Sequence, residues 1–457
     1  MLSMSEKILL CLVVILFVSI DSRADVLHYA ATLDVDIANK SVKGSVLVRV
    51  RTDSPTLTLD CGNLTIDLVR EKGAPLQFSI NDRKLIVSLA GKKREREIEV
   101  KFHGAPRYGI RFFPDRQQVH TLFSTSQWMV CNDDPADKAT FFLNLILPAG
   151  LTPVASGGLI SQRPVADNKQ LTEWLQKTPI PTYIFGFAAG PFNVVKEKHK
   201  NVEFQYFSTN YSEAEVRRIF RATPDILDFF ENRSGVKYHD NRYTTVLAAG
   251  GVEQEMGSFT ALKEAYGKQV LDNEQDLWLA AHEFAHQWWG NMVTCESWRH
   301  FWLNEGIATF MAAAYLEHRF GREAYLREIE TYRANYGKVR AAGKDKSLVF
   351  PDWSHPTRED RILVYDKGAY VMHLLREEMG ERAFWRGLKT FTKRHFGGSV
   401  VTQDFIHAME EANGKSLKPF FAKWVYLRPR IKGINQSSSG PSAPSVSLKR
   451  LRRIRLS

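Results

Sequence analysis

The sequence predicts an α+β chain of more than one domain, in which an antiparallel β-saddle or β-sandwich precedes a mostly helical domain. Two observations predict this fold class. Residues 28–202 contain many short runs in which every second residue is apolar, and residues 211–430 contain longer runs in which apolar residues recur at intervals of three and four. The first pattern is typical of strands with one buried face, and the second is typical of amphipathic helices. With 457 residues, the chain is long enough for two to three domains with separate cores.

The N-terminal segment has the pattern of a secretory signal. Lys7 precedes an apolar run over residues 8–20, and small residues at Ser22 and Ala24 offer a cleavage site. The run is shorter than the about 20 residues that a membrane-spanning helix needs. We therefore expect residues 1–24 to be a cleaved signal peptide, and the mature chain to be secreted or periplasmic without a membrane span. An uncleaved signal, which would anchor the protein in the membrane, is the alternative.

The first domain is expected over residues 25–208 and consists of strands. Alternating apolar residues mark four of them, at residues 33–37, 46–50, 85–89 and 98–102. Turn residues such as Asn and Gly separate these runs, and no long amphipathic helix interrupts them. Short alternating strands at this spacing favour one antiparallel all-β domain.

The second domain is expected over residues 209–430 and is mostly helical. It opens with a capping box from Ser212 to Glu215, and a strand over residues 243–249 then runs into a pair of glycines. Further helices are expected at residues 324–336, 365–379, 381–396 and 401–413. Residues 431–457 form a flexible linker rich in Ser and Pro, followed by a basic tail.

The net charge of +11 does not indicate a nucleic-acid partner. Five of the positive charges lie in the tail, at Lys449, Arg450, Arg452, Arg453 and Arg455. The folded body is therefore only mildly basic, and it shows no basic stripe interleaved with aromatic residues. A solvated tail is the simpler interpretation, and contact between the tail and an anionic surface is the alternative.

One short cassette carries most of the functional information: His282 and His286 in His-Glu-Phe-Ala-His, followed by Glu305. Histidines four positions apart lie about 40° apart around a helix, so both imidazoles suit neighbouring positions of a tetrahedral zinc site. Glu283 lies about 100° further round, where its carboxylate can take a proton from a metal-bound water. Glu305 begins a second helical stretch over residues 307–316 and supplies a third ligand. Three protein ligands leave the fourth position open, which is typical of a catalytic Zn²⁺.

The helix of the cassette is expected to be buried, because apolar residues precede and follow the histidines. Asp272 and Asn273 are its expected N-caps, and Gly290 is its expected end. A buried His-Glu-His trio is costly without partners, and a metal would supply one. A core helix with hydrogen-bonded histidines is the alternative.

The cassette and Trp302-Leu303-Asn304-Glu305-Gly306 together resemble the M1 family of zinc aminopeptidases. In that family eighteen residues separate HExxH from the glutamate, and residues 287–304 do so here. Three other segments resemble family motifs. The glycine-rich exopeptidase motif of the family is resembled by Gly250-Gly251-Val252-Glu253-Gln254, and its Tyr-x-Lys-Gly-Ala segment by Tyr365-Asp366-Lys367-Gly368-Ala369. A signature of its β domain is resembled by Cys131-Asn132-Asp133-Asp134-Pro135.

By this resemblance, the first domain would be the β-saddle of the family and the second its thermolysin-like zinc peptidase domain. His282, His286 and Glu305 would bind Zn²⁺. Glu283 would be the general base, and Tyr365 would stabilise the oxyanion. The chain would be a short form, because many members continue beyond this point into a large helical C-terminal domain that roofs the active site.

The resemblance also implies a carboxylate that binds the free α-amine of the substrate. The ungapped match to Gly250 and Gly251 selects Glu253, whereas an alignment shifted by two residues selects Glu255. The segment departs from the usual Gly-x-Met-Glu-Asn, since it has valine for methionine and glutamine for asparagine.

The sequence therefore predicts a zinc-dependent aminopeptidase that hydrolyses the N-terminal peptide bond of peptides with a free N-terminus. Two alternatives stay open. A zinc endopeptidase is expected if the unusual glycine-rich segment does not bind an amine. A catalytically silent peptide-binding protein is the other, although the intact Glu283 and the three metal ligands argue against it.

Overall fold

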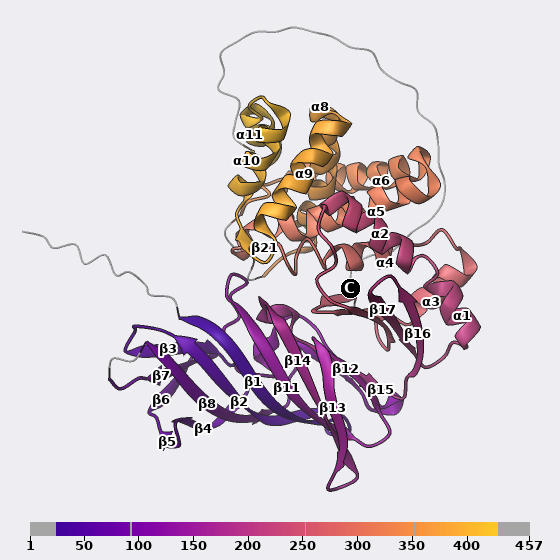
Figure 1. Ribbon diagram of the computed structural model, residues 1–457. Coiled ribbons are helices and arrows are strands. Elements are labelled where there is room, and N and C mark those ends of the chain that lie inside the picture. Colours follow the sequence, from indigo (N-terminus) through magenta and orange to yellow (C-terminus); the bar gives the residue numbers. More distant parts are fainter. Residues whose placement is uncertain (1–23, 92–93, 252, 351–352, 354, 428–457) are drawn as a thin grey trace, which may run out of the picture.

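The computed structural model describes residues 24–91, 94–251, 253–350, 353 and 355–427. It contains a β domain and a mostly helical domain, which lie in the lower and upper parts of Figure 1. The expected signal peptide, the Ser- and Pro-rich linker and the basic tail lie outside the described residues. No helix among the described residues is both long enough and apolar enough to cross a membrane.

The main sheet of the β domain has eight strands. Their order is β13 (Gly158–Val165), β14 (Lys169–Pro181), β11 (Lys138–Pro148), β1 (Asp25–Asp36), β2 (Ser41–Arg51), β8 (Glu95–Gly104), β4 (Thr65–Glu71) and β5 (Ala74–Pro75). In β1, Leu33 and Val35 are buried and the residues beside them are half-buried, as the alternation predicts. One pair, β1 with β11, is parallel, so the sheet is not wholly antiparallel as expected. The long connection through residues 37–137 is what allows this parallel pairing.

Two smaller sheets complete the β domain. One has three strands, β3 (Thr56–Asp60), β7 (Lys84–Ser88) and β6 (Phe78–Asn81). The other has four strands, β12 (Thr152–Ala155), β15 (Phe187–Gly190), β10 (Gln118–Thr121) and β9 (Ile110–Phe113). The short 3₁₀ segment η3 (Thr182–Ile184) joins the large sheet to β15.

The second domain contains a five-stranded sheet beside its helices. Its order is β16 (Asn193–His199), β17 (Val202–Ser208), β18 (Arg242–Ala248), β20 (Phe259–Lys263) and β19 (Gln254–Met256). β17 pairs with β18 in parallel, so the segment from Asn193 to Ser208 shares a sheet with the second domain. The sequence pattern assigns this segment to the first domain, because its alternation is that of any half-buried strand.

The helices of the second domain follow the expected order. They are α1 (Glu213–Ile219), α2 (Thr223–Ser234), α3 (Ala265–Asp272), α4 (Trp278–Ala285), α5 (Trp302–Phe320), α6 (Arg322–Ala341), α7 (Arg358–Ile362), α8 (Gly368–Met379), α9 (Glu381–His395), α10 (Thr402–Asn413) and α11 (Lys418–Trp424). The capping box at Ser212 is confirmed, since its hydroxyl accepts from the Glu215 amide and the Glu215 carboxylate accepts from the Ser212 amide.

The expected caps of the cassette helix are wrong. Asp272 ends α3, Asn273 is the C-cap of α3, and α4 begins only at Trp278 after an irregular turn. α4 ends at Ala285, and His286 rather than Gly290 follows it as the C-cap. The sequence prediction did not include the short helix α3. Asp272 and Asn273 belong to the end of this helix and therefore do not cap α4.

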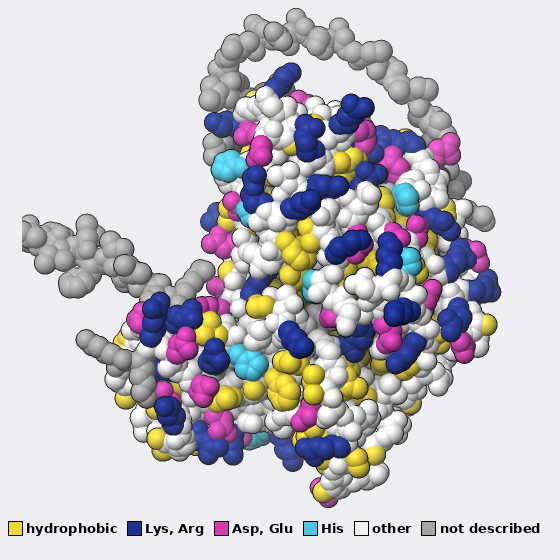
Figure 2. Space-filling model, viewed as in Figure 1, with side chains coloured by type: hydrophobic (Ala, Val, Ile, Leu, Met, Phe, Trp, Pro, Cys, Tyr) yellow, Lys and Arg dark blue, Asp and Glu magenta, His cyan; other side chains and the backbone are white. Residues whose placement is uncertain are grey.

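Direct contacts join the two domains. Lys138 donates from its Nζ to the carbonyl oxygens of Met292 (2.7 Å) and Gly398 (2.9 Å). The Gln118 Oε1 atom accepts from the Ala249 amide at 2.8 Å. The apolar core of the β domain also includes Val246 and Met256 of the five-stranded sheet. On the face shown in Figure 2, basic and acidic side chains are intermixed.

Candidate active site

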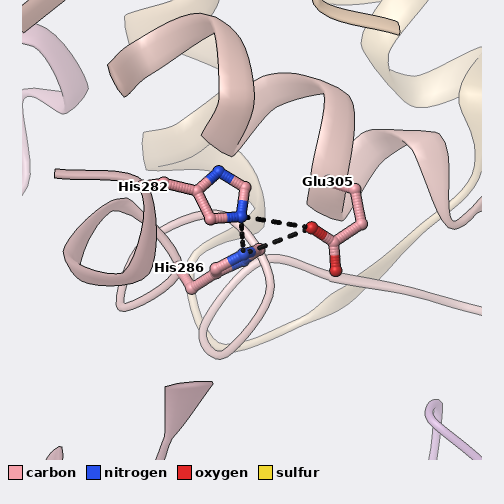
Figure 3. A group of neighbouring side chains, drawn as sticks. All are labelled: His282, His286 and Glu305. Carbon is pink, nitrogen blue, oxygen red and sulfur yellow. Dashed lines mark hydrogen bonds and ion pairs between the residues drawn. The ribbon is translucent and has the colours of Figure 1, made fainter. Parts of the chain in front are cut away.

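Helices α4 and α5 bring the three predicted metal ligands together. His282 lies on α4, His286 directly follows its last residue with helical backbone angles, and Glu305 lies in the first turn of α5. All three side chains are buried, and their nitrogen and oxygen atoms point toward a common centre in Figure 3. The i, i+4 spacing therefore places the imidazoles as predicted, although the helix ends between them.

The distances in this group fit a zinc ion. The Nε2 atoms of His282 and His286 are 3.1 Å apart, and they lie 3.5 and 3.4 Å from the Oε2 atom of Glu305. Ligand atoms of a tetrahedral zinc, each about 2.0–2.2 Å from the metal, lie about 3.3–3.6 Å from one another. Glu305 Oε2 has no hydrogen-bond partner among the described protein atoms, although it is buried. A cation between the three atoms would satisfy this oxygen and both nitrogens.

Groups behind the ligands orient the two imidazoles. The Nδ1 atom of His286 lies 3.1 Å from the Trp289 carbonyl oxygen, which fixes Nδ1 as the donor and leaves Nε2 for the metal. The Nδ1 atom of His282 lies 3.4 Å from the Thr309 hydroxyl oxygen. At Gly290, where φ is +135°, a Cβ atom would lie only 2.9 Å from His286 Nδ1. Glycine is therefore required for this close approach.

Charge within the group favours a bound cation. Burial opposes ionisation of Glu305, but His286 and His282 outweigh it and lower the pKa of this carboxyl to about 2. Glu305 is thus a carboxylate throughout the physiological range. This is the form in which glutamate binds zinc.

Glu283 lies beside the ligands, as the sequence predicts. Its side chain is buried, and one of its carboxylate oxygens lies within 4.8 Å of a carboxylate oxygen of Glu255 and of a ring nitrogen of His286. Burial raises the pKa of Glu283 well above its ordinary value, and the neighbouring carboxylates of Glu255, Glu253 and Glu305 raise it further, against the opposing effect of His286. A raised pKa suits a carboxyl group that both accepts and returns a proton near neutral pH.

The two candidates for amine binding lie in different surroundings. Glu255 is 3% exposed on β19 and reaches the group around Glu283. Its carboxylate also accepts a hydrogen bond from the Gln254 side chain, and burial raises its pKa to about 7. Glu253 forms an ion pair with Lys263 at 3.0 Å. The structure therefore brings Glu255, but not the carboxylate of Glu253, into a group with the general-base candidate and a metal ligand.

Of the two predicted glycines, Gly250 shapes the loop that leads to β19, whereas a Cβ atom on Gly251 would meet no atom within 4 Å. Gly250 has φ of +97°, and a Cβ atom there would lie 2.9 Å from the ring of Phe113 in the β domain. The Gln254 Oε1 atom accepts from the Phe123 amide at 3.1 Å, which ties the other end of the loop to the same domain. The β domain thus holds both ends of this segment.

Tyr365 lies in a π-helical turn, η5 (Leu363–Lys367), rather than in the regular helix expected from residue 365 onward. Its ring centroid is 6.0 Å from that of His282. Desolvation and the neighbouring carboxylates, first Glu305, raise the pKa of its hydroxyl well above the ordinary value. Gly306 and Gly368 allow the close packing behind this turn, since a Cβ atom on Gly306 would lie 2.9 Å from the Gly368 Cα atom. Tyr365 is therefore a neutral hydrogen-bond donor at the edge of the metal group.

Comparison with protein families identifies the chain. Residues 26–184 match the Peptidase M1 N-terminal domain, and residues 219–424 match the Peptidase family M1 domain. The chain belongs to peptidase family M1. The zinc ligands of this M1 peptidase chain, His282, His286 and Glu305, all lie within the second matched region.

The relatives of this M1 chain include curated aminopeptidases. Aminopeptidase N of Lactococcus lactis is 27% identical over 438 residues, which cover 87% of this chain and 50% of the relative. Probable aminopeptidase 2 of Sulfurisphaera tokodaii is 25% identical over 423 residues, which cover 87% of this chain and 53% of the relative. The chain thus spans about half the length of these curated relatives.

A solved structure has the same fold over nearly its whole length. The M1 zinc metallopeptidase of Deinococcus radiodurans superposes with a TM-score of 0.74 at 22% identity, over 88% of this chain and 94% of that one.

Sequence analysis missed two residues around the M1 metal site, Tyr183 and Thr309. Neither belongs to the metal-binding motif. Thr309 lies beside His282, and Tyr183 hydrogen-bonds to Gly290 and Asn304, so only the tertiary fold brings them to the site.

Proposed function

We propose that the protein is a zinc-dependent aminopeptidase, which hydrolyses the N-terminal peptide bond of peptides with a free N-terminus. One observation carries this proposal: the buried carboxylate of Glu255 lies in one group with Glu283 and the zinc ligand His286. A carboxylate in this position can pair with the α-ammonium group of a substrate. The first peptide bond then lies next to Glu283 and the metal ligands.

The residues of the chain supply the proton transfers. Zinc, when bound by His282, His286 and Glu305, polarises a carbonyl group and lowers the pKa of water. Glu283 accepts the proton of the attacking water at its carboxylate and then donates it to the leaving nitrogen. The Tyr365 hydroxyl donates a hydrogen bond to the substrate carbonyl oxygen as negative charge develops on it.

Glu255 provides the reason for cleavage at the end of a peptide. A charge-assisted hydrogen bond to the ammonium group fixes the register of the substrate, because an internal peptide nitrogen carries no charge. Gln254 orients the carboxylate, and the Phe123 amide in turn orients Gln254. Glu253 is less suited to this role, because Lys263 already neutralises it.

The relatives support the same activity. Several are curated as aminopeptidases, among them the Lactococcus lactis protein. A mutant of the Deinococcus radiodurans metallopeptidase has been crystallised with a Tyr-Ser-Ala substrate, and a mutant two-domain M1 zinc metallopeptidase has been crystallised with L-tryptophan. These are a short peptide and a free amino acid, the classes of molecule that an aminopeptidase binds and releases.

A pair of substrates tests the proposal. The protein is assayed on an aminoacyl-arylamide and on its N-acetylated counterpart, with and without a zinc chelator. Chelator-sensitive cleavage of the free-amine substrate alone is the expected result. Cleavage of the blocked substrate or of internal bonds would instead indicate an endopeptidase, and no cleavage of any peptide would indicate a silent binding protein.

We also propose that the enzyme acts outside the cytoplasm, on the strength of the signal pattern in residues 1–24. N-terminal sequencing of protein recovered from the periplasm or medium is the test. A new N-terminus near Asp25 is expected, whereas an intact N-terminus in the membrane fraction would indicate an anchor.

A further inference from the structure

A tyrosine of the β domain reaches the surroundings of the metal site. Tyr183 lies in η3, and its side chain is 1% exposed. Its hydroxyl donates to the carbonyl oxygen of Gly290 at 3.1 Å and accepts from the Nδ2 atom of Asn304 at 3.1 Å. Both partners belong to the second domain, so one buried hydroxyl group joins the two domains at this point.

Each partner of this hydroxyl is close in sequence to a metal ligand. Asn304 directly precedes Glu305, and its Oδ1 atom accepts from the Cys295 amide at 3.0 Å. Gly290 ends the turn in which His286 Nδ1 contacts the Trp289 carbonyl oxygen. The hydroxyl therefore ties the loop after α4 to the start of α5, the two segments that carry His286 and Glu305.

Aromatic packing fixes the position of the hydroxyl. The Tyr183 ring stacks on Phe123, with centroids 5.4 Å apart and planes inclined by 13°. Trp298 packs edge-on against the same ring, with a centroid distance of 5.0 Å. A ring held on two sides places its oxygen reproducibly, as is required of a group that sets the spacing of two chain segments.

We propose that Tyr183 is a positioning residue of the zinc centre, so that the β domain helps to set the metal affinity of the helical domain. Zinc ligands must hold their spacing to within a few tenths of an ångström, and groups outside the ligand shell that fix this spacing typically contribute about 10–100-fold in metal affinity. Without the hydroxyl, the Gly290 carbonyl and the Asn304 amide lose a buried partner, and the two ligand-bearing segments can separate. The proposal concerns metal binding and does not depend on the aminopeptidase activity.

The test is the zinc affinity of a Tyr183→Phe variant of the full chain, measured by competition with a chromophoric chelator. Phenylalanine keeps the aromatic packing and removes only the hydroxyl. We expect zinc to bind about 10–100-fold more weakly. Tyr29→Phe is the matched control, because Tyr29 is also fully buried in the β domain and its hydroxyl accepts from the Asn132 amide of the same domain at 2.8 Å. The control is expected to bind zinc within twofold of the native protein.

Cobalt gives a second readout that a general loss of stability would not produce. The visible absorption of Co²⁺ depends on its ligand geometry, so Co²⁺ in Tyr183→Phe is expected to show an altered spectrum and Co²⁺ in the control a native one. Native zinc affinity and a native cobalt spectrum in Tyr183→Phe would overturn the proposal. Equal weakening in both variants would overturn it too, because it would show general loosening.

A second variant covers the case in which Tyr183→Phe does not fold, as judged by urea unfolding of the zinc-free protein. Asn304→Ala removes the other end of the link, and unchanged zinc affinity in this variant would overturn the proposal. If both single variants fold, their double variant is expected to lose less than the product of the two single effects, because the residues act through one hydrogen bond. If the losses of zinc affinity in the two single variants multiply in the double variant, the two residues act independently, and the proposal is overturned.

Discussion

The carboxylates of Glu255 and Glu283 approach each other to within 4.8 Å beside the zinc ligand His286. Two acidic groups at this distance in a buried site repel each other unless a positive group lies between or beside them. Zinc provides one such charge, and a substrate ammonium group provides another. Replacement of Glu255 is therefore the best test of whether cleavage is restricted to the N-terminal peptide bond.

We predict that Glu255→Gln lowers kcat/KM for free-amine substrates about 100-fold, since the loss of one partner of a buried charge pair costs about 2–5 kcal/mol. Steady-state kinetics on an aminoacyl-arylamide measures the effect. Glu253→Gln is the matched control and should change kcat/KM less than tenfold, because Glu253 pairs with Lys263. The reverse order of the two effects would restore the alignment in which Glu253 binds the amine.

We predict that Glu283→Gln retains zinc but lowers kcat by about 10²–10⁴, the usual contribution of a general base. Glutamine has the shape of glutamate and cannot accept the proton. Metal analysis of the purified variant and kcat on a free-amine substrate are measured together. A zinc-loaded variant with kcat within tenfold of native would exclude Glu283 as the base.

We predict that Tyr365→Phe lowers kcat by about 10²–10³ and leaves KM nearly unchanged, because the hydroxyl donates to charge that develops only during the reaction. Tyr370→Phe, on the next turn of the same helical segment, is the control and should keep native kinetics. A rise in KM without a fall in kcat would instead assign Tyr365 to substrate binding.

The metal ligands could be predicted from the sequence because their geometry is local. The i, i+4 spacing fixes the relative direction of His282 and His286, and Glu305 follows in the first turn of the next helix. The choice between Glu253 and Glu255 is not local. It depends on the register of β19 against β20, where Glu255 lies opposite Thr260. Glu253 and Glu255 are two residues apart, so alternation along an extended strand gives both the same face and cannot choose between them.

Contacts between segments that are distant in the chain could not be predicted from the sequence patterns. Tyr183 lies more than 100 residues before Asn304, and an isolated tyrosine in a β domain gives no signal of a role near a metal. The parallel pairing of β1 with β11 has the same origin, since alternation shows which face of a strand is buried but not which strand lies beside it. The helix caps failed at Asp272 because a carboxylate ordinarily favours a helix N-terminus, whereas Asp272 ends α3 and pairs there with Lys268, one turn earlier.

We predict that zinc stabilises the fold in a concentration-dependent manner. The three ligands are brought together only in the folded chain, so each tenfold rise in free zinc above its Kd should add about 1.4 kcal/mol to the free energy of unfolding. Urea unfolding at buffered zinc concentrations measures this slope. Glu305→Ala, which removes one ligand, should require much higher zinc for the same gain, and an identical response in this variant would place the stabilising zinc elsewhere.

A buried histidine of the β domain, His120, should control stability in mild acid. His120 in β10 is 2% exposed, its Nδ1 atom has no hydrogen-bond partner among the described residues, and its ring stacks on Phe113. Burial, with a smaller effect from Arg111, lowers the pKa of His120 from 6.5 to about 4. Between these two values the unfolded chain binds a proton at this site and the folded chain does not. The stability contributed by the neutral imidazole is therefore fully present above pH 6.5 and is lost as the pH falls toward 4.

The size of this effect sets the experiment. A shift from 6.5 to about 4 corresponds to about 3 kcal/mol over the full interval, at about 1.4 kcal/mol for each pH unit. We expect His120→Phe, which keeps an aromatic ring against Phe113 and cannot be protonated, to flatten the pH dependence of urea unfolding between pH 6.5 and 4. His407→Phe is the matched control for the substitution itself, because His407 lies on the exposed side of α10 and its replacement removes no buried imidazole. A slope unchanged in His120→Phe would show that other groups, such as the carboxyls of the metal site, govern the acid sensitivity of the fold.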